Sequence, residues 1–219
     1  MKNFFTKLFT KENMKKFFYS FVWLMVLMFV IDIVTKWVVV NHFGVDEMNA
    51  GIRHNDSNVI TIIKNFLYIG GSINNKAAFS LGPSRVWLLI ISIVMSIGFI
   101  VFYVIQYKKL NTVYKLALAL MISGAIGNLI DRAFYWPSTT GFDGVVDWII
   151  FVFWGWEFAM FNIADACLVI GIIIILIEII IEEVKEAKRK AKRGEYKYSP
   201  EELKKKEEDE ASKGNSGTK

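Results

Sequence analysis

Residues 17–40 read FFYSFVWLMVLMFVIDIVTKWVVV, an apolar run that is long enough to cross a lipid bilayer as a helix. A bilayer core of about 30 Å needs about 20 helical residues. Three further runs meet this requirement, at about 86–107, 113–130 and 163–181. Of the 219 residues, 54% are hydrophobic, which argues against a water-soluble or a disordered chain. We therefore predict an all-α membrane protein with four transmembrane helices.

The composition excludes several kinds of site. The single cysteine, Cys167, allows neither an intrachain disulfide nor a multi-cysteine metal centre, and two histidines cannot form a His-rich zinc site. The net charge of +5 raises the possibility of nucleic-acid binding, but the basic runs border apolar stretches and suit a membrane surface better. We expect no metal, no cofactor and no nucleic-acid partner.

The distribution of lysine and arginine predicts the orientation in the membrane. Basic residues concentrate in 1–16, in the 108–115 connection and in 182–219. By the positive-inside rule, we expect these three segments, and with them both termini, in the cytoplasm. We divide the chain into a basic cytoplasmic N-terminal arm (1–16), a four-span domain (17–181) and a charged, partly disordered cytoplasmic tail (182–219).

Two loops are then expected on the outer face. In the first, residues 59–69 (VITIIKNFLYI) are β-prone and are followed by two glycines, which predicts a small β-rich element. In the second, Asp147–Phe161 is apolar but too short and too rich in tryptophan for a span. We interpret it as an interfacial segment that could act as a gate.

Polar residues in the spans gather at one predicted depth. Charged groups inside a bilayer are costly, so a group of them near the outer ends of the spans suggests a shared polar site. Asp32 and Lys36 have a second interpretation as a structural i,i+4 pair, and Asp131 with Arg132 could simply tie a loop to a helix end. The residues concerned are Asp32, Lys36, Asn128, Asp131, Arg132 and Asp165.

Helical spacing supports a common site. Gly124, Asn128 and Asp131 stand at i, i+4 and i+7, on one helix face. Gly124 and Gly127 would allow a second helix to approach closely. Asn162 precedes Asp165 by three residues at the start of the last span.

Five sequence blocks together resemble lipoprotein signal peptidase (signal peptidase II), an intramembrane aspartic peptidase of bacteria. The blocks occur in the order and spacing of that family and extend over 17–181. They are DIVTKW (32–37), NNKAAFS (74–80), SGAIGNLIDR (123–132), GVVDWI (144–149) and FNIADACLVIG (161–171).

The resemblance implies a function and a set of site residues. It implies an endopeptidase that cuts prolipoproteins before a diacylglyceryl-modified cysteine, with Asp147 and Asp165 as the catalytic pair. It also implies a β-cradle in the outer loop, contact with membrane lipid, and inhibition by the cyclic peptide globomycin. We expect a monomer. Residues implied to bind substrate or support the site are Asn74, Gly124, Asn128, Arg132, Asn162 and Ala164, and Asp32, Lys36 and Asp131 are implied to hold the polar site together.

The sequence departs from the family at four places. Lys76 stands where the family usually has glycine, Ser123 replaces the first glycine of its block, the 133–161 connection is longer, and the charged arm and tail are additions. Lys76 makes the local turn and the contacts with substrate or inhibitor uncertain.

Two other classes of function remain open from the residues alone. A proton-coupled transporter or channel also needs polar groups in the membrane, although its path should extend through the full depth. The other class is a structural membrane subunit. Hydrolysis predicts that the Asp147 and Asp165 carboxyls lie within roughly 3–6 Å, a distance that one water can bridge.

Overall fold

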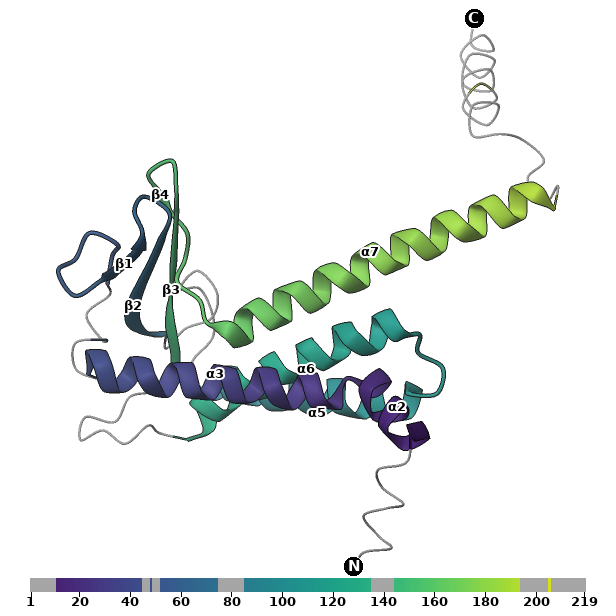
Figure 1. Ribbon diagram of the computed structural model, residues 1–219, viewed down its shortest axis with the longest axis horizontal. Helices are drawn as coiled ribbons and strands as arrows, with labels where there is room; N and C mark the ends of the chain where they lie inside the picture. Colours follow the sequence, from purple (N-terminus) through teal and green to yellow (C-terminus); the bar gives the residue numbers. More distant parts are fainter. Residues whose placement is uncertain are drawn as a thin grey trace, which may run out of the picture. The chain divides into compact units, whose positions relative to one another are not determined.

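The computed structural model describes residues 11–44, 48, 52–74, 85–134, 144–193 and 205. Lys76, Trp136 and most of the 182–219 tail therefore lie outside the described residues. The chain divides into two compact units, Met1–Ile175 and Leu176–Lys219. Figure 1 shows the elements, which are α2 (Lys11–Ser20), α3 (Val22–Phe43), β1 (Ile60–Ile63), β2 (Leu67–Asn74), α5 (Arg85–Gln106), α6 (Thr112–Ala133), β3 (Val145–Phe153), β4 (Trp156–Glu157) and α7 (Ile163–Lys192).

Four helices in the described part of the chain are long and apolar enough to cross a membrane: α3, α5, α6 and α7. This confirms the predicted fold class, a mostly helical membrane protein with a small sheet. The last helix does not end at residue 181 but continues to Lys192. We call the end where α3 and α6 finish and α7 begins the sheet end, because the strands lie there (Figure 1).

The first span begins at Val22 and not at residue 17. Phe21 has a left-handed backbone, with φ of 54°, and this ends α2 before α3 starts. The break is held by two contacts: the Trp23 indole donates to the Phe18 carbonyl at 3.2 Å, and the Tyr103 hydroxyl donates to the Ser20 carbonyl. Neither glycine nor proline marks the break, so the apolar run looks continuous in the sequence.

Helix α6 is the central span. In its apolar stretch 61% of the residues are buried, against 17% in the corresponding stretches of α3 and α5. Its small residues allow this, because a Cβ on Gly124 would collide with the Ala164 carbonyl oxygen and one on Gly127 would lie 2.5 Å from Asp32 Oδ2. The predicted close approach of helices at Gly124 and Gly127 is therefore confirmed, and it brings α3 and the start of α7 against α6.

The strands form one antiparallel sheet in the order β1-β2-β3-β4. The segment 147–161, which we interpreted as an interfacial segment, supplies most of β3 and all of β4. Val146 of β3 is fully buried against Val39 and Phe43 near the end of α3. This small core fixes the sheet to the helices and places β3 beside their polar residues.

Candidate active site

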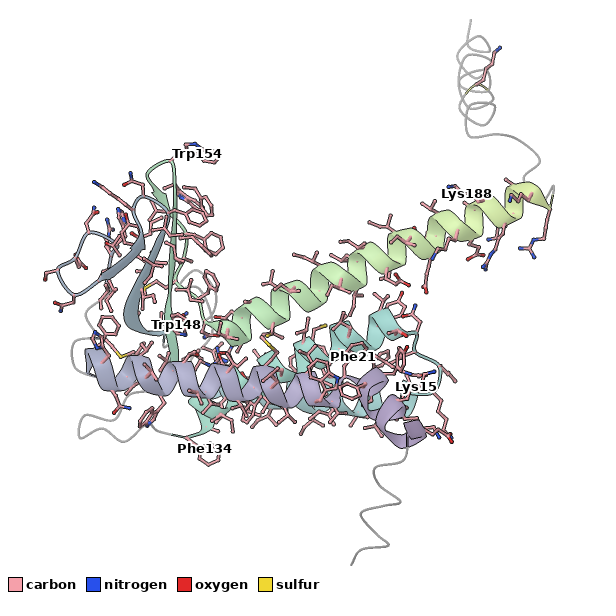
Figure 2. All side chains as sticks on the ribbon, in the orientation of Figure 1. Lys15, Phe21, Phe134, Trp148, Trp154 and Lys188 are labelled. Atoms are coloured by element: carbon pink, nitrogen blue, oxygen red, sulfur yellow. The ribbon has the colours of Figure 1, made fainter. Side chains whose placement is uncertain are left out.

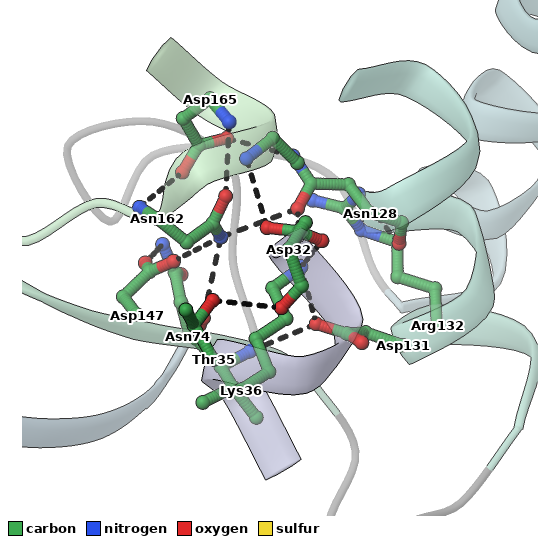
Figure 3. A network of polar contacts seen from close by, with 12 residues as sticks. Asp32, Thr35, Lys36, Asn74, Asn128, Asp131, Arg132, Asp147, Asn162 and Asp165 are labelled. Carbon is green, nitrogen blue, oxygen red and sulfur yellow. Dashed lines mark hydrogen bonds and ion pairs between the residues drawn. The ribbon is translucent and has the colours of Figure 1, made fainter. Parts of the chain in front are cut away.

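A buried network of polar side chains joins five elements at the sheet end (Figure 3). The structure brings together residues that are up to 132 positions apart in the sequence. The side chains of Asp32 and Lys36 are completely buried, and Asn128, Asp131, Asp147 and Asn162 are nearly so. The members are Asp32 and Lys36 from α3, Asn74 from β2, Asn128 and Asp131 from α6, Asp147 from β3, and Asn162 and Asp165 at the start of α7.

Asn162 and Asp165 cap the first turn of α7 reciprocally. The Asn162 side-chain oxygen accepts from the Asp165 backbone N–H at 2.9 Å, and Asp165 Oδ2 accepts from the Asn162 N–H at 3.3 Å. The Asn162 carbonyl accepts the first helical bond, from Ala166. This is a capping box, with Asn162 at the N-cap and Asp165 three residues later. The cap fixes the Asp165 carboxyl where the positive end of the helix dipole favours its ionised form.

Asp147 is held by amides on both of its oxygens. Asn162 Nδ2 donates to Oδ1 at 2.8 Å, and Asn74 Nδ2 donates to Oδ2 at 3.0 Å. The ends of β2 and β3 meet closely here, because a Cβ on Gly144 would lie 2.6 Å from the Asn74 carbonyl oxygen. Glycine at 144 therefore lets Asn74 reach the carboxyl of Asp147.

The two carboxyls lie on either side of Asn162. Its side-chain amide contacts Asp147 and its backbone N–H contacts Asp165 (Figure 3). Burial, and next the charge of Asp165, raise the pKa of Asp147 to about 7, against the opposing effect of the amides and of Lys36. A pair of neighbouring carboxyls, one buried and one partly buried, in which one member readily holds a proton is suited to acid and base catalysis.

Lys36 connects the supporting residues. Its ammonium lies 2.8 Å from Asp32 Oδ2, 2.9 Å from Asp131 Oδ2 and 3.2 Å from Asn128 Oδ1. The i,i+4 ion pair that the sequence suggested is thus present, and Asp131 belongs to the same cluster. Because the ammonium occupies the oxygen of the Asn128 amide, the amide nitrogen faces Asp165, to which it donates at 2.7 Å.

The two structural carboxylates also bind backbone. Asp32 Oδ1 accepts from the Ala164 N–H at 2.9 Å, in the first turn of α7. Asp131 Oδ2 accepts from the Val146 N–H at 3.2 Å, next to Asp147. Lys36 and its two partners therefore hold in place the segments that carry Asp165 and Asp147.

Arg132 lies at the side of the network, between α6 and α5. Its Nη1 donates to Ser92 Oγ of α5 at 3.2 Å and to the Asn128 carbonyl at 3.3 Å. No contact with either carboxyl of the pair is seen among the described residues. Sequence analysis did not predict that Ser92 and the Val146 backbone take part in the polar network. No local sequence motif marks either residue.

In the described part of the chain, no cluster of three or more His, Cys, Asp or Glu side chains could hold a metal ion. The site contains one buried carboxyl, Asp147, and one partly buried carboxyl, Asp165, with four amide or backbone donors around them. Such a site can position a water molecule, take a proton from it, and donate a hydrogen bond to a polarised carbonyl.

Comparison with known proteins agrees with this chemistry. A family model described as "Signal peptidase (SPase) II" matches residues 24–181, which contain every member of the network. Two solved structures, both described as a bacterial membrane enzyme structure obtained by the in meso method, are 30% identical to the chain. The one at 2.3 Å resolution covers 73% of this chain and 86% of its own with a TM-score of 0.56, and the one at 1.9 Å covers 71% and 88% with 0.53.

Proposed function

The chain belongs to the signal peptidase II family, and on that basis we propose that Asp147 and Asp165 are its catalytic pair. The family makes it a membrane peptidase of the aspartic type that acts on lipoprotein signal peptides. We propose further that it cuts prolipoproteins before a cysteine carrying a diacylglyceryl group. The observation that carries the assignment is the position of two carboxyls, Asp147 buried and Asp165 partly buried, against the same residue, Asn162.

The surroundings of the two carboxyls suggest how they divide the work. Asp165, in the capping box of α7, is the carboxylate that takes a proton from the attacking water. Asp147, with its raised pKa, keeps a proton and hydrogen-bonds the scissile carbonyl oxygen. As the water oxygen bonds to the carbonyl carbon, the proton of Asp147 passes to the carbonyl oxygen and a gem-diol forms. On collapse, one hydroxyl proton of the gem-diol returns to Asp147, the C–N bond breaks, and the proton held by Asp165 passes to the leaving nitrogen.

The other residues have orienting roles in this proposal. Asn74 and Asn162 direct the Asp147 carboxyl, and Asn128 directs Asp165. Gly124 and Ala164 allow α6 and α7 to approach, and Arg132 steadies the Asn128 backbone from the side of α5. We assign no chemical step to Asp32, Lys36 or Asp131, which hold the elements together.

The membrane placement follows from the positive-inside rule. We propose that both termini are cytoplasmic and that the sheet end faces the outside of a bacterial cell membrane. The lipid-modified cysteine lies at that depth, so its acyl chains can stay in the outer leaflet while the peptide bond reaches the pair. The proposed enzyme is a monomer that needs no cofactor.

Cleavage of a lipid-modified prolipoprotein by the full-length enzyme in detergent tests the pair. Asp147→Asn and Asp165→Asn should each lower turnover by about 10²–10⁴-fold, the range for a lost general acid or base. Asp56→Asn is the matched control, because Asp56 is an exposed aspartate that only accepts from the Arg53 N–H. Globomycin should inhibit the wild-type enzyme. Turnover close to wild type in either site variant would remove that aspartate from the pair.

The transporter and structural-subunit alternatives have less support. No described contact favours either of them, and the family match covers the whole network.

A further inference from the structure

The hairpin that joins β3 to β4 ends in an exposed tryptophan with an unfavourable backbone. The turn consists of Trp154 and Gly155, with φ of 50° and 81°. A two-residue turn with positive φ at both positions normally uses Asn, Asp or Gly first. A bulky aromatic residue in this conformation is a genuine outlier, and its cost has to be offset by something.

Packing within the described protein does not offset this cost. Trp154 has 101% of its reference surface exposed, and Trp156 has 60%. Figure 2 shows Trp154 at the tip of the hairpin, far from Trp148 at its base. Trp154 thus contributes nothing to the core, although an asparagine would fit the turn better.

The hairpin is also free of charge. Residues 148–156 read WIIFVFWGW, without a single ionisable side chain. The acid that follows, Glu157, is paired with His54, whose Nδ1 lies 2.5 Å from Glu157 Oε2. An uncharged aromatic surface that reaches past the body of the protein indicates an apolar or amphipathic partner.

A continuous row of aromatic rings leads from the hairpin back to the site. Trp156 contacts Phe158, which contacts Phe161, which stacks on Phe151, with centroid distances of 5.8, 6.0 and 5.6 Å. Phe161 directly precedes Asn162 and α7. Residues of α7 such as Val169 and Ile170 are exposed and belong to a membrane-spanning surface. The aromatic row therefore ends at the residue just before Asn162 and α7, one of the helices that are long and apolar enough to cross a membrane.

The direction of the strand keeps the hairpin close to the bilayer. In Figure 1, β3 crosses the direction of α3 near the C-terminal end of that helix. If α3 spans the membrane, β3 runs along the membrane surface and does not project away from it. From Asp147 to Trp154 the strand extends for about 23 Å, at about 3.3 Å per residue.

We propose that the β3–β4 hairpin is a membrane anchor whose tip, Trp154 and Trp156, inserts into the interfacial region of the outer leaflet. Indole rings favour this region because they are apolar with one polar N–H group. The anchor fixes one end of β3, and thereby the depth of Asp147, relative to the lipid from which the substrate arrives. The inference depends on the membrane placement and not on the catalytic assignment.

Spin labelling of the full-length protein in vesicles tests the anchor. We replace Trp154 by Cys in a Cys167→Ala background, attach a nitroxide, and reconstitute the protein in phosphatidylcholine and phosphatidylglycerol vesicles. Ser57→Cys, on an exposed polar turn of the same unit, is the matched control. Relative to the control, the label at 154 should be at least about threefold less accessible to a water-soluble nickel chelate and more accessible to oxygen, which concentrates in lipid.

Two results would overturn the proposal. A label at 154 that is as accessible to nickel as the one at 57 places the tip in water. A label that neither reagent reaches shows that the tip is covered by protein, such as a second copy. Because this readout needs no cleavage, it can fail while the peptidase assignment stands, and the reverse is also true.

A second variant separates anchoring from folding. Trp154→Asn suits the left-handed turn, so the thermal midpoint of the protein in detergent should not fall. In vesicles the same variant should raise KM for a membrane-embedded substrate and leave kcat unchanged. A lower midpoint in detergent would mean that Trp154 serves the fold, and an unchanged KM would mean that the tip does not set the depth of the site.

Discussion

Replacing Lys36 by methionine should destabilise the protein strongly, because it leaves two buried carboxylates without their cation. Lys36 lies 2.8 and 2.9 Å from the oxygens of Asp32 and Asp131, and all three side chains are fully buried. At an effective dielectric constant of about 20, each pair attracts by about 6 kcal/mol before desolvation is subtracted. Removing one partner of a buried pair costs about 3–5 kcal/mol in practice, and this is the loss of unfolding free energy that we expect.

The measurement is equilibrium unfolding in mixed micelles, with two comparisons. Lys16 forms an equally short i,i+4 pair with Glu12, at 2.7 Å, but both side chains are more than two-thirds exposed. Lys16→Met should therefore leave the free energy of unfolding essentially unchanged, because solvent screens an exposed pair. The triple variant Lys36→Met, Asp32→Asn, Asp131→Asn has no buried charge in the cluster, yet keeps an acceptor for each backbone N–H. It should recover about 2 kcal/mol or more of the loss.

The reasoning is refuted if Lys36→Met costs less than about 1 kcal/mol, a value typical of an exposed pair. It is also refuted if the triple variant is no more stable than the single one, because the loss would then come from packing and not from unpaired charge. Turnover should fall in both, since the Asn128 amide loses the contact that directs its nitrogen to Asp165.

Three further predictions concern the site. Gly124→Ala should lower the free energy of unfolding by about 1–3 kcal/mol and lower turnover, because the added Cβ would collide with the start of α7. The control Gly98→Ala should be neutral or stabilising, because a Cβ there has no atom within 4 Å. Equal effects of the two variants in thermal unfolding would contradict this prediction. In the folded protein Asp147 keeps its proton up to about pH 7, whereas in the unfolded chain an aspartate releases it near pH 4. The contribution of Asp147 to stability therefore declines as the pH rises from about 4 to about 7. Asp147→Asn should therefore gain about 2–3 kcal/mol relative to wild type between pH 5 and 8, and a difference independent of pH would exclude the raised pKa. Asn162→Ser keeps an N-cap oxygen but loses the amide that donates to Asp147. The free energy of unfolding should therefore fall less than in Asn162→Ala, while turnover falls as far as in that variant. A serine variant with normal turnover would show that the amide is not needed.

Much of the fold could be predicted because the thickness of the bilayer sets the length of apolar sequence that a spanning helix needs. A run of about 20 apolar residues identifies a span without any tertiary information. The common depth of Asp32, Lys36 and Asn128 could be predicted for the same reason, since buried charge in lipid must find partners. The close packing at Gly124 likewise follows from residue size.

The remainder depends on contacts between distant segments. The helix break at Phe21 is stabilised by Tyr103, and nothing near Phe21 signals it. The run from Asp147 to Phe161 is apolar throughout, so its period does not distinguish a strand from an interfacial helix. The contact of Arg132 with Ser92 depends on the rotation of α6 against α5, which the sequence does not specify.

The supporting cluster described above is electrically balanced: Asp32 and Asp131 match Lys36 and Arg132 in formal charge. Among the described residues, the charge that this count leaves unmatched is the single negative charge that the proton-sharing pair Asp147 and Asp165 carries. A charged peptide residue beside the scissile bond would therefore meet no spare counter-ion in the described part of the network, and we expect this to favour substrates with uncharged residues at that position.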